Sequence, residues 1–301
     1  MDGLILVDKP QGVSSHDVVV RLRRILKQQR IGHFGTLDPL ATGLLLAAAG
    51  RAARLFPVYS KADKSYAGAI RLGFSTDTYD ALGKPTSPET TRFPDRGSLA
   101  GAIKELIGRL DQVPPPYSAK KLRGKPLYKW ARAQKTAMVK PVAVSVYSFD
   151  LTDYAPPFLS FEVRCSSGTY IRSLAHELGR SLSCGAHLFS LRRTTVGRHS
   201  LADSHSLTEI ARLAYEGKPE RFLVPLESLL PECPKAILSE TGLRCLRKGK
   251  SLPPEHVVSL IRPADGGAAE TFRLFSLEGR FLALAKPSPD ETSLVPFLLL
   301  S

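Results

Sequence analysis

The most informative segment of the sequence is Gly32-His33-Phe34-Gly35-Thr36-Leu37-Asp38-Pro39-Leu40-Ala41-Thr42-Gly43. Its glycines and its proline predict a loop, and the apolar residues 44–49 directly after it predict a buried strand. Taken alone, Asp38 before a proline is typical of a turn in which the carboxylate caps the backbone. Taken alone, His33 is typical of a hydrogen-bonded structural histidine. Other parts of the sequence are needed to tell whether Asp38 or His33 has a functional role as well.

The segment before this stretch predicts a strand and an amphipathic helix. Residues 4–7 form a short apolar run that ends at Asp8-Lys9-Pro10, as a buried strand would. Ser14 or Ser15 can cap a helix whose apolar residues share one face. The far end of this helix is strongly basic, with Arg21, Arg23, Arg24, Lys27 and Arg30.

Strand and helix patterns continue through the first 230 residues. Residues 66–72 and 159–165 alternate in polarity, which is typical of half-buried strands. Residues 99–110 have helical spacing, and the turn at residues 166–169 opens another helix. Strands and helices without a regular β-α-β rhythm predict an α+β fold, with a largely antiparallel mixed sheet flanked by helices.

The chain divides near the proline-rich residues 230–234. Short strand-like runs separated by turns follow at residues 257–261, 271–276, 280–284 and 294–300. We therefore expect two domains, residues 1–230 and a small β-rich domain at residues 231–301, which are usual domain sizes.

The charge of the chain is less ordinary than its composition. Its 301 residues are 43% apolar and 23% charged, but 42 Lys and Arg against 28 Asp and Glu leave a net charge of +14 at pH 7. Residues 112–149 contain eight of these cations and no Asp or Glu, with Tyr117, Tyr128 and Trp130 between them. Unopposed cations among aromatics suit phosphate contact and base stacking, so we expect a polyanionic partner. A solvated charged loop is the alternative.

Neither a metal site nor a membrane segment is expected. The cysteines form no C-x-x-C pair, and no His–Cys cluster has the spacing of zinc ligands. The apolar run near the N-terminus is bracketed by Asp2 and Asp8 and is too short for a signal peptide or a membrane span. We expect a soluble, cytoplasmic protein with free thiols at Cys165, Cys184, Cys233 and Cys245.

Five motifs in order give the chain a resemblance to a known family. Residues 32–43 resemble the catalytic motif of the TruB family of tRNA pseudouridine synthases, Gly-His-Thr-Gly-Thr-Leu-Asp-Pro-Leu-Ala-Thr-Gly, at every position except Phe34. That departure lies beside the catalytic position and bears on loop packing rather than on the reaction. The other motifs resemble the family at residues 6–15, 64–80, 167–172 and 191–194, and residues 113–131 resemble its RNA-gripping insertion.

The resemblance implies conversion of the T-loop uridine at tRNA position 55 to pseudouridine. This isomerisation breaks the N1–C1′ bond and rejoins the ribose at C5. It needs a carboxylate held against a flipped nucleotide, as a nucleophile or an electrostatic stabiliser. By resemblance Asp38 is that carboxylate, Arg172 keeps it ionised, and Tyr66 stacks on the base or moves a proton. The positions implied in substrate binding are Lys9, His33, Lys120, Lys121, Tyr170 and Leu191.

The same reaction implies RNA as the partner and no cofactor. The sequence shows no P-loop, no dinucleotide-binding glycine fingerprint and no cluster of metal ligands, and the isomerisation needs none of these groups. The expected partner is the T-arm stem-loop of tRNA, bound by a monomer. Residues 1–230 are then the catalytic domain and residues 231–301 a PUA-like RNA-binding domain.

Alternatives stay open for single residues and for the substrate. Without the motifs, Arg172 is typical of a surface arginine at a helix terminus and Tyr66 of a core-facing tyrosine in a strand. The rival enzymes are pseudouridine synthases that act on ribosomal RNA or need a guide RNA. The rival of another class is a non-catalytic RNA-binding or RNA-folding protein.

Overall fold

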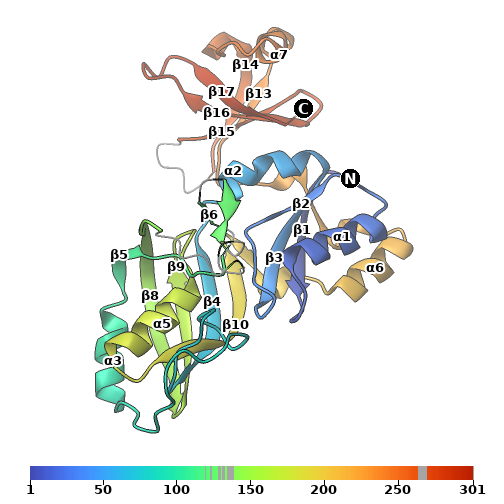
Figure 1. Ribbon diagram of the computed structural model, residues 1–301. Coiled ribbons are helices and arrows are strands. Elements are labelled where there is room, and N and C mark those ends of the chain that lie inside the picture. The colour runs from blue at the N-terminus through green and yellow to red at the C-terminus, as the bar shows by residue number, and fades with distance from the viewer. Residues whose placement is uncertain are drawn as a thin grey trace.

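The computed structural model describes residues 1–118, 120–122, 124–127, 130, 133, 139–263 and 270–300 (Figure 1). Most of this chain forms a ten-stranded sheet, and a five-stranded sheet follows at the C-terminal end. Two short strands, β6 (Lys121–Leu122) and β7 (Lys125–Pro126), pair apart from both sheets. The α+β class predicted from the sequence is confirmed.

The larger sheet is mixed and largely antiparallel. Its strands are β1 (Gly3–Lys9), β2 (Ile31–Phe34), β3 (Thr42–Ala49), β4 (Lys64–Leu72), β5 (Gly108–Gln112), β8 (Val142–Ala155), β9 (Phe158–Cys165), β10 (Ala186–Val196), β11 (His199–Ser200) and β12 (Leu223–Pro225). Their order is β12-β1-β3-β10-β4-β9-β8-β5, with β2 beside β3 and β11 beside β10. Among the described strands of this sheet, only β3 and β10 pair in parallel. This pair brings the loop before β3 next to the end of β10.

Strand β3 is buried on both faces. Leu45, Ala47 and Ala49 belong to one apolar cluster, whereas Leu44, Leu46 and Ala48 belong to another. Successive side chains of a strand point to opposite faces, so a strand covered on both sides needs a continuous apolar sequence. The buried strand predicted at residues 44–49 is confirmed.

Helices flank the larger sheet and one covers the smaller. They are α1 (Ser15–Ile25), α2 (Phe56–Tyr59), α3 (Arg96–Lys104), α5 (Ile171–Ser181), α6 (Leu207–Tyr215) and α7 (Glu240–Arg247). Short 3-10 helices are η1 (Gly50–Leu55), η2 (Leu201–Asp203), η3 (Pro219–Arg221), η4 (Leu226–Ser228) and η5 (Pro254–His256). Ser14 is the cap of α1, in a reciprocal capping box with Asp17. No helix among the described residues is long and apolar enough to span a membrane.

One predicted helix is shorter than its sequence pattern. Helical spacing extends over residues 99–110, but α3 ends at Lys104 and β5 begins at Gly108. Gly108 has a φ of 106°, a left-handed conformation that ends helical geometry. Residues 108–112 pair instead with β8 at the edge of the sheet. Tertiary pairing overrides the local spacing here.

The smaller sheet lies at one end of the larger one (Figure 1). Apolar side chains of the two parts share a buried cluster. Its order is β14-β13-β15-β16-β17. The strands are β13 (Lys235–Leu238), β14 (Val257–Ile261), β15 (Phe272–Phe275), β16 (Phe281–Pro287) and β17 (Leu294–Leu299). Phe275, Phe281 and Leu284 share one buried cluster with Leu226 and Leu229. The proline-rich residues 230–234 therefore lie just before β13, and residues on both sides of them share one apolar cluster.

Candidate active site

A pocket of about 370 Å³ opens where the loop before β3, strand β4, the start of α5 and the end of β10 meet. It lies at the parallel β3–β10 pair, so the topology of the sheet positions it. Residues from four sequence motifs and from the basic insertion converge on this pocket. The predicted site residues that line it are Asp38, Tyr66, Lys120, Tyr170, Arg172 and Leu191.

Backbone contacts hold the loop that carries Asp38. Ser15 accepts a hydrogen bond from Leu37 N at 2.8 Å and donates one to Leu37 O at 3.1 Å. Gly12 N donates to Pro39 O at 2.8 Å. The first turn of α1 and the N-terminal motif thus fix the loop on both sides of Asp38.

Glycine is required where this loop enters β3. Gly43 has a φ of 96°, and a Cβ added there would lie 2.4 Å from the carbonyl oxygen of Arg193. Any side chain would push β3 away from β10, so the close approach of the two strands depends on this glycine.

Arg172 connects three parts of the site. Its Nε lies 2.9 Å from Asp38 Oδ2, and its Nη1 lies 3.7 Å from Asp80 Oδ2. The same guanidinium donates to the backbone carbonyls of Thr78 and Tyr117, both at 2.9 Å. Only 5% of the Arg172 side chain is exposed, so the surface-arginine alternative is wrong.

The ionisation of Asp38 depends on opposing effects of burial and of the neighbouring charges. Its side chain is 42% exposed and opens into the pocket, whereas that of Asp80 is 7% exposed. Burial raises the pKa of the Asp38 carboxyl, Arg172 acts in the opposite direction, and Asp80 raises it again. One guanidinium therefore serves two carboxylates, and the charge of Arg172 favours ionised Asp38.

Tyr66 belongs both to the core and to the pocket. It is 8% exposed on β4, within the main apolar cluster, and it lines the pocket. Burial raises the pKa of its phenol, and the guanidinium of Arg193 beside it acts in the opposite direction. Arg193 is 1% exposed and donates to the carbonyls of Leu44 (2.7 Å) and Gly35 (3.1 Å). Tyr66 therefore packs in the core and lines the pocket at once, so its core contacts do not exclude access to a ligand.

Two buried lysines lie close to the same loop. Lys64 lines the pocket and donates Nζ to two backbone carbonyls before β4. Lys9 is fully buried and donates Nζ to the carbonyls of Pro10 (3.0 Å) and Val13 (2.7 Å). Burial lowers the pKa of both ammonium groups to about 8.

The structure does not bring every predicted residue to the pocket wall. The lining includes Lys120 but neither Lys9 nor His33, which is half-buried on β2. Burial lowers the pKa of the His33 imidazole, which favours the neutral ring. The side chain of Lys121 lies outside the described residues. The other members of the basic, aromatic segment that lie outside them are Arg123, Tyr128, Lys129, Arg132, Lys135 and the side chain of Lys125.

Gln112 is a site residue that the sequence did not single out. Helix α5 has Tyr170 as its N-cap, with no side-chain hydrogen bond from that residue. Gln112 Nε2 donates to Tyr170 O at 3.1 Å, and Gln112 Oε1 accepts from Tyr170 N at 2.7 Å. A buried amide from β5 therefore fixes the turn of helix that carries Arg172.

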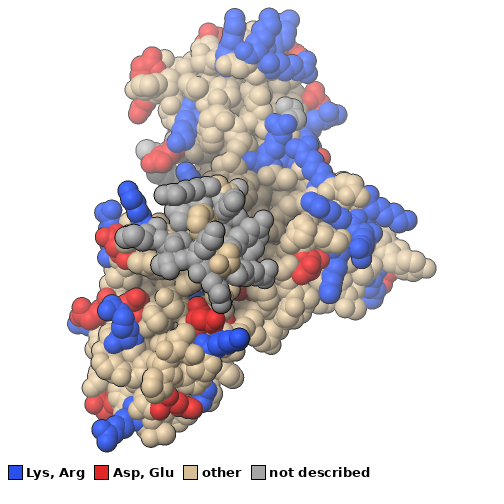
Figure 2. Space-filling view, in the orientation of Figure 1, with Lys and Arg blue, Asp and Glu red and all other residues tan. Residues whose placement is uncertain are grey.

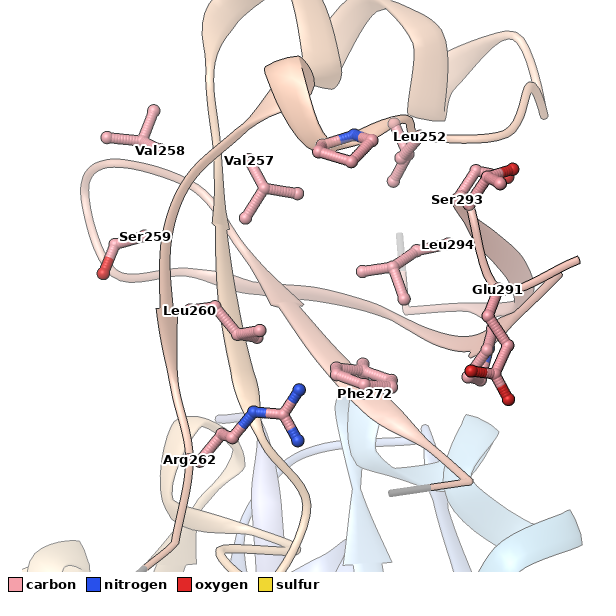
Figure 3. Close-up of a pocket in the computed structure, with 13 residues that line it drawn as sticks. Leu252, Val257, Val258, Ser259, Leu260, Arg262, Phe272, Glu291, Ser293 and Leu294 are labelled. Atoms are coloured by element: carbon pink, nitrogen blue, oxygen red, sulfur yellow. The ribbon is translucent and has the colours of Figure 1, made fainter. Parts of the chain in front are cut away.

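A larger cavity, of about 500 Å³, lies in the smaller sheet (Figure 3). Apolar side chains such as Val257, Leu260 and Phe272 form its wall, and Arg262 and Glu291 stand at its edge. It contains none of the motif residues. Convergent polar chemistry, rather than size, identifies the smaller pocket as the candidate active site.

The fold is the pseudouridine synthase fold. Over 99% of the chain it is similar to a solved structure of the archaeal box H/ACA sRNP Nop10–Cbf5 complex, with a TM-score of 0.72, 23% identity and 86% of that chain covered. A Cbf5–Nop10–Gar1 complex is similar over 99% of the chain and 85% of that chain, with a TM-score of 0.73 and 24% identity. These likenesses establish the fold.

Sequence comparison establishes the family. Residues 23–171 match the N-terminal domain of TruB family pseudouridylate synthases, and residues 172–231 match the tRNA pseudouridylate synthase B C-terminal domain. The tRNA pseudouridine synthase B of Solibacter usitatus is 41% identical over 84% of this chain and 86% of its own length. That of Dehalococcoides mccartyi is 36% identical over 97% of this chain and 94% of its own length. The chain belongs to the TruB family.

Proposed function

We propose that this protein converts uridine 55 in the T loop of tRNA to pseudouridine. The observation that carries the proposal is the ion pair between Asp38 and Arg172 at 2.9 Å, in a pocket that Tyr66 also lines. The relatives named above are tRNA pseudouridine synthases B, and isomerisation of uridine is the activity of the family.

The pocket provides the groups that the isomerisation requires. A uridine must leave its stack to reach Asp38, which costs a few kcal/mol, and stacking on an aromatic ring returns about 1–3 kcal/mol. Tyr66 supplies that ring. Asp38 acts as the nucleophile: its carboxylate forms a bond with the nucleotide while the N1–C1′ bond breaks, and this bond is broken again as the new bond forms between C5 and C1′. The proton lost from C5 is balanced by one gained at N1, and Tyr66 moves it with Arg193 beside its hydroxyl.

The remaining site residues position the substrate. Tyr170 and Leu191 line the pocket around the flipped base. Lys9 supports the Asp38 loop through its two carbonyl contacts, and its charge favours ionised Asp38. His33 holds the rearranged RNA loop after the base has left it.

RNA contacts outside the pocket come from one basic segment and from the C-terminal part of the chain. Residues 112–149, with Lys120 at the pocket and Lys121 beside it, grip the T-arm stem-loop. Residues 231–301 form a PUA-like RNA-binding domain that assists binding, while residues 1–230 form the catalytic domain. The protein acts as a cytoplasmic monomer without a cofactor.

Mapping of pseudouridine tests this proposal. Total RNA from cells with and without the gene is compared at every uridine. The expected result is loss of pseudouridine at tRNA position 55 alone, restored by the purified protein in the presence of EDTA. Loss at ribosomal positions instead would support the rival synthase, and an unchanged map would support a non-catalytic RNA-binding protein.

A further inference from the structure

The far end of α1 carries cations that the proposed chemistry does not use. Arg21, Arg24, Lys27 and Arg30 are all exposed, and we call these four residues the α1 basic surface. Within the described chain, none of the four forms an ion pair with a carboxylate. Figure 2 shows Lys and Arg side chains gathered on the right, where α1 lies in Figure 1.

The helix dipole accounts for only part of this charge. Cations are favourable in the last turn of a helix, where Arg23 lies. Arg23 also donates a hydrogen bond to Ile31 O at 2.7 Å. Lys27 and Arg30, however, lie beyond Ile25, the last residue of α1. The acid on α1, Asp17, is engaged with Ser14 in the capping box at the opposite end. Asp17 also lies four residues before Arg21 and interacts with it electrostatically, whereas Arg24, Lys27 and Arg30 have no such acid on α1. Like charges therefore crowd this end of the helix, which favours a polyanionic partner.

Lys27 occupies a position that favours glycine. Its φ is 48°, in the left-handed region. Gln28 N donates to Arg23 O at 3.1 Å and Lys27 N to Arg24 O at 3.4 Å, which is the Schellman arrangement that ends a helix. A side chain with a Cβ is disfavoured at this position. Lys27 therefore ends α1 in a conformation that glycine would adopt at lower cost, and its side chain adds a fourth exposed cation at this end of the helix.

The α1 basic surface lies within reach of an RNA bound at the pocket. Ser15, the first residue of α1, is hydrogen-bonded to Leu37 beside Asp38. Helix α1 has 11 residues, so its far end lies about 16 Å along its axis from that contact. We propose that this surface binds the sugar-phosphate backbone of the tRNA whose target uridine occupies the pocket. The inference rests on the proposed function and adds a second anchoring point to it.

Charge removal with a matched control tests the inference. The test variant carries Gln at Arg21, Arg24, Lys27 and Arg30. The control carries Gln at Lys84, Arg92, Arg96 and Lys104, four exposed cations in and before α3. The dissociation constant for unmodified tRNA is measured over a range of salt concentrations, and both variants are checked by melting curves.

The test variant should bind tRNA about tenfold or more weakly at physiological salt, and its log K against log[salt] slope should become shallower by about 3. The control should stay within about twofold of wild type, with a slope change below about 1. Equal behaviour of the two variants would overturn the inference. At saturating enzyme the test variant should keep the wild-type single-turnover rate. A wild type that forms no pseudouridine would refute the proposed function and leave the binding comparison valid.

Lys27→Gly provides a second, independent test. The substitution relieves the left-handed conformation and removes one charge, so the melting temperature should rise while the salt slope becomes shallower by about 1. A rise in melting temperature with unchanged tRNA binding would count against a phosphate contact at Lys27 and against the proposal.

Discussion

Replacing Arg172 by methionine leaves two carboxylates without their shared cation. The guanidinium lies 2.9 Å from Asp38 and 3.7 Å from Asp80. Opposite charges about 4 Å apart attract by about 4 kcal/mol at an effective dielectric constant of about 20. Because the Asp38 side chain is 42% exposed, solvent reduces this attraction, and we use about 2 kcal/mol. That energy corresponds to a rise of about 1.5 units in the pKa of Asp38.

The expected result is a shift of the acid limb of the pH–rate profile. Single-turnover formation of pseudouridine, measured with enzyme in excess over tRNA, should fall off at a pH about 1.5 units higher in Arg172→Met than in wild type. A pH-independent loss should accompany the shift, because the hydrogen bonds to the Thr78 and Tyr117 carbonyls are also removed. Arg172→Lys keeps the charge and should move the acid limb much less.

A double variant separates charge from geometry. Adding Asp80→Asn to Arg172→Met removes one of the two unpaired carboxylates, so the acid limb should move back toward that of wild type. An acid limb at the same pH in all of these proteins would refute the assignment of Arg172 as the group that keeps Asp38 ionised.

Three further predictions concern the surroundings of the pocket. The pKa of Lys64 is about 8 in the fold, below its ordinary 10.5, so the unfolded chain binds the additional proton between these values and stability rises with pH across that window. Lys64→Met should abolish up to about 3 kcal/mol of this rise, and an unchanged pH dependence of unfolding would contradict the burial argument. Gln112→Ala should destabilise the fold by about 1–3 kcal/mol and lower kcat more than tRNA affinity, because α5 loses the amide that fixes Tyr170. Unaltered kinetics would exclude this positioning role. Removal of residues 231–301 should lower the melting temperature and expose apolar surface to a hydrophobic dye, because Leu226 and Leu229 lose their contacts in the cluster with Phe275 and Phe281. A melting temperature equal to that of wild type would show that the two sheets do not stabilise each other.

The strands and loops that depend on local sequence could be predicted. Residues 44–49 are apolar without interruption because both faces of β3 are covered. Residues 159–165 alternate because β9 covers the core with one face. The end of α3 could not be predicted, because pairing of β5 with β8 depends on residues far along the chain.

Prediction of the candidate site depended on the family motifs, because hydrophobic periodicity and charge did not indicate which residues would meet. Asp38 and Arg172 are far apart in sequence, and only the fold brings them to 2.9 Å. Asp80 lay within a recognised motif, but its burial against Arg172 had no local signal. Gln112 also had no local sequence signal. Its role at the start of α5 is visible only from its two hydrogen bonds to the backbone of Tyr170. Lys9 was expected to contact substrate, whereas its Nζ is hydrogen-bonded to backbone carbonyls.

The substitution Asp38→Asn tests whether the carboxylate of Asp38 performs the isomerisation. Tritium release from tRNA with C5-labelled uridine is measured beside tRNA binding and thermal melting. We expect undetectable release, with binding preserved. We also expect a melting temperature no lower than that of wild type, because burial disfavours the ionised carboxylate. Turnover within about tenfold of wild type, a barrier change of only about 1.4 kcal/mol, would mean that Asp38 only forms the turn and does not perform the isomerisation.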